Sequence, residues 1–152
     1  MNSGLLLGSG RKVYPASAVL LAPKELAYAS GNASQTGITT ATDITSLSIT
    51  FTVVYWPVEV ELFAAFITAS TAALFGDVYV ADGSNTVMAY GLFSVYASAA
   101  YATGRAVERI TTPGTYTRKG RIERGGGTGT INIGGNTANS NAFIKATEVR
   151  NR

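Results

Sequence analysis

The sequence contains no histidine and no cysteine in its 152 residues. Histidine is the commonest general base and the commonest metal ligand, so its absence excludes Ser-His-Asp triads and zinc sites of ordinary composition. The absence of cysteine excludes disulfide bonds and thiolate ligands. We therefore expect no catalytic residues, no metal site and no cofactor, and we expect that the protein is not an enzyme.

Charged residues are also scarce, at 14% of the chain, whereas 46% of the residues are hydrophobic. Small hydroxyl residues must then cover much of the surface, as in β proteins whose strands alternate Ser or Thr outside with aliphatic residues inside. Such a surface also suits assembly into something larger. The cations are unevenly placed, because residues 105–152 hold nine of the twelve Lys and Arg residues.

Long apolar runs are missing too. The longest uncharged stretch, residues 83–104, is interrupted by Asn85, Thr86, Ser94 and Ser98 and by repeated glycines. A membrane-spanning helix needs about 20 predominantly apolar residues, so we expect no membrane insertion.

What the chain does contain is hydrophobic alternation with a period of two. In SLSITFTV and again in VEVEL, aliphatic or aromatic residues alternate with Ser, Thr or Glu, which predicts strands with one face in the core. The segment from Asp82 to Asn85 begins with Asp-Gly and predicts a hairpin turn that needs a positive φ. About eight or nine such strands with turns between them predict an all-β antiparallel β-sandwich of the jelly-roll kind.

Residues 1–40 lack this period and are rich in Gly, Ser and Ala. We interpret them as an irregular N-terminal docking arm, with one short strand or helical turn near residues 23–28, and residues 41–152 as the sandwich domain. The apolar run of Leu5, Leu6 and Leu7 would be a liability on a monomer, which makes it a candidate inter-subunit contact. Packing of the arm on its own domain is the alternative.

The segment ERGGGTGTINIGGN, residues 123–136, holds six glycines in fourteen positions. A phosphate-binding loop needs glycines at fixed offsets and then a helix, but Asn132 stands where the third glycine belongs and a strand-like pattern follows. We therefore interpret the segment as a glycine turn between two antiparallel strands.

The strand YTRKGRIER is the most basic part of the chain. A nucleic-acid surface needs aromatic residues among its cations, and only Tyr116 qualifies, so we expect no nucleic-acid partner. Alternation places Arg118 on the inner face, where it needs a carboxylate or carbonyl partner. A partner across a symmetry axis would satisfy it, which makes Arg118 a second candidate inter-subunit contact.

Two groups of residues have the character of a carbohydrate site. Trp56, Tyr90, Tyr96 and Tyr101 are candidates for stacking on sugar rings, although such residues also fill cores and subunit interfaces. The second group is Glu59 and Glu61, about 7 Å apart on one strand face, a spacing that nominally allows inverting glycoside hydrolysis. Alternating Glu is also ordinary on a solvent-facing strand, and we favour that interpretation.

Three segments, TSLSITFTVVYWPVEVELF, ERITTPGTYTRKGRIERGGGTGTINIGG and AFIKATEV, resemble the small jelly-roll domains of tailed-bacteriophage virion proteins. The shared features are a Thr-rich strand before a P-V-x-V strand, a P-G-T-Y-T turn into a basic strand, a G-T-G turn and a final strand ending in Glu-Val. The similarity covers about residues 43–149. It implies a structural or attachment role, commonly as a homotrimer, with no cofactor and no catalytic set.

On this basis we expect a non-enzymatic structural protein of a bacteriophage virion, a minor tail or tail-tip subunit assembled in the host cytoplasm. Its partners would be further copies of itself and other virion proteins. A capsid decoration protein fits the same features, and the sequence does not separate tail from head. A carbohydrate-binding module that recognises a host-surface glycan is the alternative from a different class.

Overall fold

The computed structural model describes residues 22–31, 34–71, 74–96, 100–134 and 142–150, and within these ranges it contains strands and no helix. In chain order the strands are β1 (Lys24–Gly31), β2 (Gln35–Ile38), β3 (Thr42–Val53), β4 (Val58–Ala69), β5 (Leu74–Asp82), β6 (Val87–Val95), β7 (Ala102–Ile110), β8 (Gly114–Gly126), β9 (Ile131–Ile133) and β10 (Ala142–Glu148). Every pairing is antiparallel, so the predicted all-β antiparallel sandwich is confirmed.

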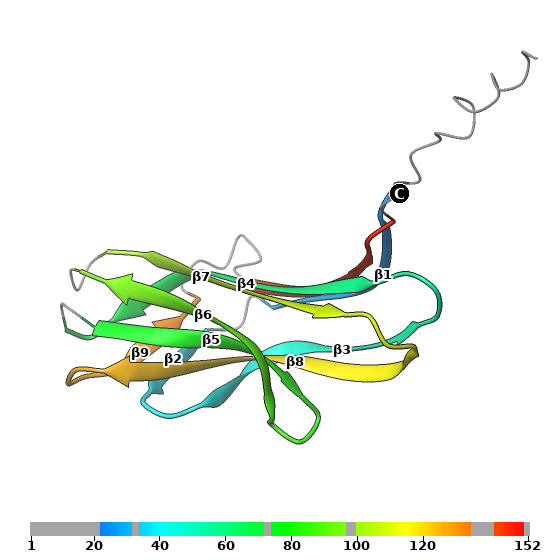
Figure 1. Cartoon of the computed structure of the whole chain (residues 1–152). Helices are drawn as coiled ribbons and strands as arrows, with labels where there is room; N and C mark the ends of the chain where they lie inside the picture. The colour runs from blue at the N-terminus through cyan, green and yellow to red at the C-terminus, as the bar shows by residue number, and fades with distance from the viewer. Residues whose placement is uncertain (1–21, 32–33, 72–73, 97–99, 135–141, 151–152) are drawn as a thin grey trace, which may run out of the picture.

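The strands form two layers, with β1, β4 and β7 in one and β3, β5 and β8 in the other (Figure 1). Sheet I has the order β1-β10-β4-β9-β2, with β7 paired to β4 as well. Sheet II has the order β3-β8-β5-β6. Strand β4 is long enough to pair β10 along residues 58–64 and β9 along residues 67–69.

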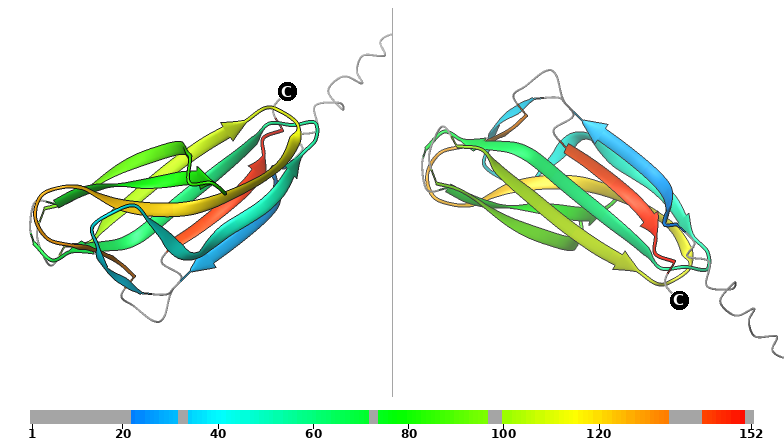
Figure 2. Two further views of the ribbon diagram at one scale, coloured as in Figure 1. Left: turned by 90° about the horizontal axis from the view of Figure 1, so that it is seen from below. Right: turned by 90° about the horizontal axis from the view of Figure 1, so that it is seen from above.

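Pairing in the sandwich is nested. β1 pairs with β10, β3 with β8, β4 with β7, and β5 with β6, so partners come from progressively closer parts of the chain. The chain crosses from one sheet to the other after β2, β3, β4, β6, β7 and β8. Seen from the two faces, the strands run along the long axis of the molecule, so most turns lie at its two ends (Figure 2).

The core lies between the sheets and follows the predicted alternation. In β3 the side chains of Leu47, Ile49 and Phe51 are buried while the hydroxyl residues between them are exposed, and β4 buries Val58 and Val60 in the same way. The largest fully buried side chains are Leu47, Leu62, Leu74, Ile67, Ile122, Ile131, Ile133 and Ile144. Removing this apolar surface from water is the main force that holds the two sheets together.

The sandwich is closed along one side by a close approach of β6 to β7. A Cβ atom added to Gly91 of β6 would lie 1.8 Å from the carbonyl oxygen of Arg105 on β7. Only a residue without a side chain allows this approach between strands of different sheets.

Residues 24–38, assigned from the sequence to the arm, belong to sheet I in the structure. The short strand expected near residues 23–28 is β1, and this part of the chain packs on its own domain, the alternative given for the arm. β1 pairs with β10 at the edge of sheet I, and β2 pairs with β9. The sequence of β1, KELAYASG, hides its alternation because small residues occupy most of its half-buried positions. Residues 1–21, which include Leu5, Leu6 and Leu7, lie outside the described residues.

The predicted hairpin turn forms between β5 and β6. The N–H of Asn85 donates to the carbonyl oxygen of Asp82 at 3.1 Å, and the Asp82 carboxylate accepts from the N–H groups of Ser84 and Thr86 at 2.8 Å each. The positive φ falls on Asn85, at 75°, and not on Gly83. Asn tolerates this left-handed conformation better than most side chains do.

Candidate functional site

Large apolar side chains are exposed along β6, the edge strand of sheet II. Leu92 is 71% exposed, Tyr90 67% and Met88 39%, whereas Phe93 and Val95 on the opposite face of the strand are buried. Contiguous exposed apolar surface is rare on soluble monomers and marks interaction sites.

Strand β5 extends this surface. Its pairing with β6 sets Tyr79 opposite Tyr90, and Asp77 opposite Leu92. Phe75 at the start of β5 is 50% exposed. We call this surface the β5–β6 face and define it as Phe75, Asp77, Tyr79, Met88, Tyr90, Leu92, Ser94 and Tyr96, with Glu123 of the adjacent strand β8.

Two carboxylates lie opposite each other in the β5–β6 face. Asp77 of β5 is the register partner of Glu123 of β8, and like charges directly opposite destabilise a sheet. Burial and then the charge of Glu123 raise the pKa of Asp77. Glu123 accepts a hydrogen bond from the Tyr79 hydroxyl, and burial together with this bond raises the pKa of Tyr79.

Within the described ranges, no Lys or Arg nitrogen lies within 4.0 Å of either carboxylate. Asp43, on β3 of the same sheet, is in contrast paired: it accepts from Lys119 Nζ at 2.7 Å and from Arg121 Nε at 2.6 Å. Burial opposes the ionisation of Asp43, but these bonds outweigh it and lower its pKa. The β5–β6 face therefore offers apolar surface beside uncompensated negative charge.

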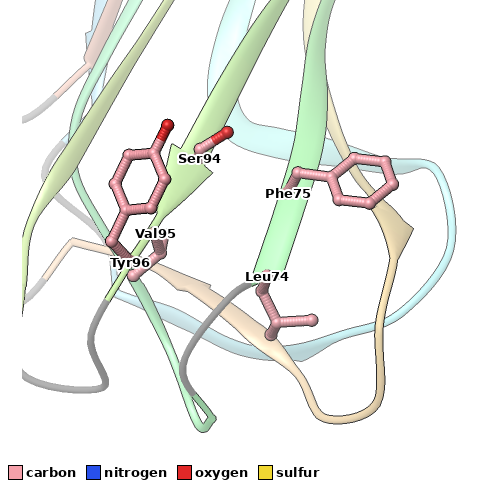
Figure 3. A pocket seen from close by; sticks show the side chains of 5 residues that line it. All are labelled: Leu74, Phe75, Ser94, Val95 and Tyr96. Atoms are coloured by element: carbon pink, nitrogen blue, oxygen red, sulfur yellow. The ribbon is translucent and has the colours of Figure 1, made fainter.

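A shallow hollow of ≈ 160 Å³ lies at one end of this face. It is lined by Leu74, Phe75, Ser94, Val95 and Tyr96, and the Phe75 ring points away from Tyr96 (Figure 3). Sites for small molecules and cofactors usually span about 300–1,000 Å³. The hollow is therefore of a size for one side chain or one sugar ring.

The four aromatic candidates do not form one site. Tyr90 and Tyr96 lie on the β5–β6 face, and Tyr101, before β7, packs edge to face on Phe66 with ring centroids 5.4 Å apart. Trp56 lies in the turn after β3, at the opposite end of the sandwich. The three tyrosines are exposed, so they do not fill the core.

Arg118 finds its carboxylate partner within its own chain. It is 6% exposed, and its Nε and Nη2 atoms donate to the two oxygens of Glu108 at 2.6 and 2.7 Å. The guanidinium also lies 5.1 Å from the centroid of the Tyr116 ring. A partner across a symmetry axis is not needed, and the burial of Arg118 argues against the predicted inter-subunit contact.

Glu59 and Glu61 line a second hollow, on the outer face of sheet I, together with Arg105 and Lys145. Glu61 lies 2.6 Å from Arg105 Nε and 2.7 Å from Lys145 Nζ. Burial opposes the ionisation of Glu61, but these two cations outweigh it and lower its pKa. A glycosidase acid needs a raised pKa, so this group has the character of a surface ion network.

The glycine segment is a turn, as predicted. Gly127 and Gly129 have φ values of 86° and 122°, and the Gly129 carbonyl accepts from Arg124 Nη1 at 2.6 Å. The N–H of Thr130 donates to Ser70 Oγ at 2.8 Å. The turn differs from the prediction in one respect: it joins β8 of sheet II to β9 of sheet I and is not a hairpin.

Sequence reasoning missed the pair of Asp77 and Glu123. The alternation in GDVYVAD places Asp77 and Tyr79 on the outer face of their strand, which is a usable signal. Alternation does not say which strands are neighbours, however, and the two carboxylates are 46 positions apart in the chain.

Among the described residues, no group of three or more Asp and Glu side chains is placed to hold a metal ion. The described part of the chain also has no helix long and apolar enough to cross a membrane.

No protein-family model matches the chain, and no curated protein matches it in sequence. The candidate site therefore rests on the geometry of the β5–β6 face.

Proposed function

We propose that the protein is a non-enzymatic structural subunit of a bacteriophage virion, located in the tail or tail tip. The observation that carries the proposal is the β5–β6 face, where Leu92 and Tyr90 are exposed beside two carboxylates that form no ion pair with any Lys or Arg of the described residues. Aliphatic side chains such as Leu92 and Met88 do not stack on sugars but are common in protein contacts. The face therefore suits assembly better than ligand recognition.

We also propose that the sandwich is a jelly roll. A jelly roll has eight strands in two sheets built from two Greek keys. The nested pairs of β1 with β10, β3 with β8, β4 with β7 and β5 with β6 fit this arrangement. This supports the resemblance to phage virion proteins, which in turn implies a homotrimer.

Quantitative mass spectrometry of purified particles tests the virion role. We expect a copy number in intact particles that corresponds to a few rings of subunits if the protein belongs to the tail. A copy number that scales with the capsid lattice would instead indicate a decoration protein. Absence from purified particles would contradict both.

A carbohydrate-binding role is the second candidate. It is favoured by the 67% exposure of Tyr90, which lies opposite Tyr79 and near the carboxylate of Asp77. Exposed rings beside hydrogen-bond acceptors are the arrangement that sugar rings and hydroxyls require. Binding on a glycan array that is lost in Tyr90→Ala or Tyr96→Ala, but kept in Tyr55→Ala at the other end of the molecule, would favour this role.

A further inference from the structure

We propose that the β5–β6 face binds the N-terminal segment, residues 1–21, of a neighbouring copy of the chain. The inference rests on the proposed function in one respect, since its occupant is another subunit of the same protein. The segment contains Leu5, Leu6, Leu7 and the basic pair Arg11 and Lys12, and it contains no Asp or Glu.

The charges of the two surfaces are complementary. Asp77 and Glu123 face each other across neighbouring strands, and no Lys or Arg of the described residues pairs with either. A cation placed between two carboxylates removes their mutual repulsion, which otherwise disfavours the charged form of Asp77. Arg11 and Lys12 supply two such cations in adjacent positions.

The apolar parts are also complementary. Leu92, at 71% exposure, lies directly opposite Asp77, so apolar and acidic groups adjoin on this face. A segment with leucines a few residues before its cations can cover both. The hollow of ≈ 160 Å³ beside Phe75 has room for one leucine side chain.

Geometry favours a neighbouring copy over the same chain. Ala22 precedes β1 at the end of the sandwich where β8 begins, since Lys24 pairs with Glu148 at the end of β10. From there Glu123 is about 30 Å along the strands. Arg11 can lie at most about 40 Å from Ala22, so its own segment would have to pass fully extended from the edge of sheet I to β5.

The absence of cysteine allows a direct test by disulfide cross-linking of full-length chains. One chain carries Ser9→Cys in the N-terminal segment, and a second, size-tagged chain carries Ser94→Cys on the β5–β6 face. The matched control is Ser30→Cys, which is exposed on β1 of sheet I. Under mild oxidation we expect the Ser9→Cys and Ser94→Cys chains to form at least several-fold more heterodimer than the control pair.

A heterodimer yield equal to that of the control would overturn the inference. So would a chain carrying both Ser9→Cys and Ser94→Cys that closes a disulfide within itself while the mixed single variants do not react. Mass spectrometry under non-reducing conditions separates these results.

The role of charge is tested in the same assay. Asp77→Asn with Glu123→Gln keeps the shapes of both side chains and is expected to lower the heterodimer yield several-fold at low salt, whereas Glu59→Gln on sheet I leaves it unchanged. An equal yield in all variants would contradict the charge pairing.

The native mass of the wild-type chain separates failure of this inference from failure of the proposed function. If the chain is an oligomer but shows no specific cross-linking, the N-terminal segment does not occupy the β5–β6 face, and the subunits assemble through another surface. A monomer without cross-linking would count against both.

Discussion

Arg118 and Glu108 connect the two sheets inside the core. Arg118 extends from β8 of sheet II and Glu108 from β7 of sheet I, and each guanidinium-to-carboxylate bond is 2.7 Å or shorter. A buried pair of this kind contributes little net stability against an apolar pair, but it makes the loss of one partner costly. It therefore restricts which residues fit at both positions.

Removing one member of this pair should destabilise the fold strongly. We expect Arg118→Met to lower the free energy of unfolding by about 3–5 kcal/mol, because Glu108 is left charged and buried. The double variant with Glu108→Met should recover most of that loss. Urea denaturation measures both effects.

Arg109→Ala is the matched control for an exposed pair. The Arg109 Nη1 atom lies 3.5 Å from a carboxylate oxygen of Glu59, and both side chains are about half exposed. Exposed ion pairs contribute about 0–1 kcal/mol, so Arg109→Ala should be nearly neutral. Equal losses for Arg118→Met and Arg109→Ala would show that the buried pair has no special cost.

Glu61 should make the stability depend on pH. Its pKa is lowered in the folded chain, since Arg105 and Lys145 outweigh the effect of burial. A carboxyl group of this kind stabilises the fold above its unfolded pKa, and that contribution is lost as the pH falls through the folded value. As the pH is lowered below about 5, we expect the free energy of unfolding to fall less steeply in Glu61→Gln than in the wild type. Parallel curves for the two proteins would show that Glu61 does not contribute to the pH dependence.

At the scale of elements, strand alternation predicted which side chains enter the core. The inward positions of Leu47 and Ile49 in β3 and of Val58 and Val60 in β4 follow from side-chain period alone. The same reasoning missed β1, because the small residues of β1 give too weak a contrast between its faces. It also missed the order of strands in each sheet, which depends on contacts between distant parts of the chain.

Gly91 is the residue on which the closure of β6 against β7 depends. We expect Gly91→Ala to destabilise the fold by at least about 1–3 kcal/mol, because the new methyl group would overlap the backbone of Arg105. Gly83→Ala is the control, since an added Cβ there meets nothing within 4 Å. Thermal unfolding of the two variants compares them, and equal midpoints would mean that the two strands can separate without cost.

At the scale of the whole molecule, the two-sheet architecture was predictable and the candidate site was not. Eight or nine alternating segments with turns between them lead to a sandwich by elementary packing rules. Asp77 and Glu123 lie opposite each other because β5 and β8 are neighbours, and Leu92 is exposed on the strand at the edge of sheet II. Local sequence patterns do not contain the order of the strands.

The native mass of the full-length chain, measured by analytical ultracentrifugation over a range of concentrations, tests the assembly role most directly. We predict a discrete oligomer, a trimer from the resemblance to virion proteins, that dissociates in Leu92→Glu. That change leaves the core intact because Leu92 is 71% exposed, and Val107→Glu on sheet I, at 39% exposure, should not dissociate the oligomer. A wild-type chain that is monomeric at every concentration would contradict the proposal that this protein is an assembly subunit.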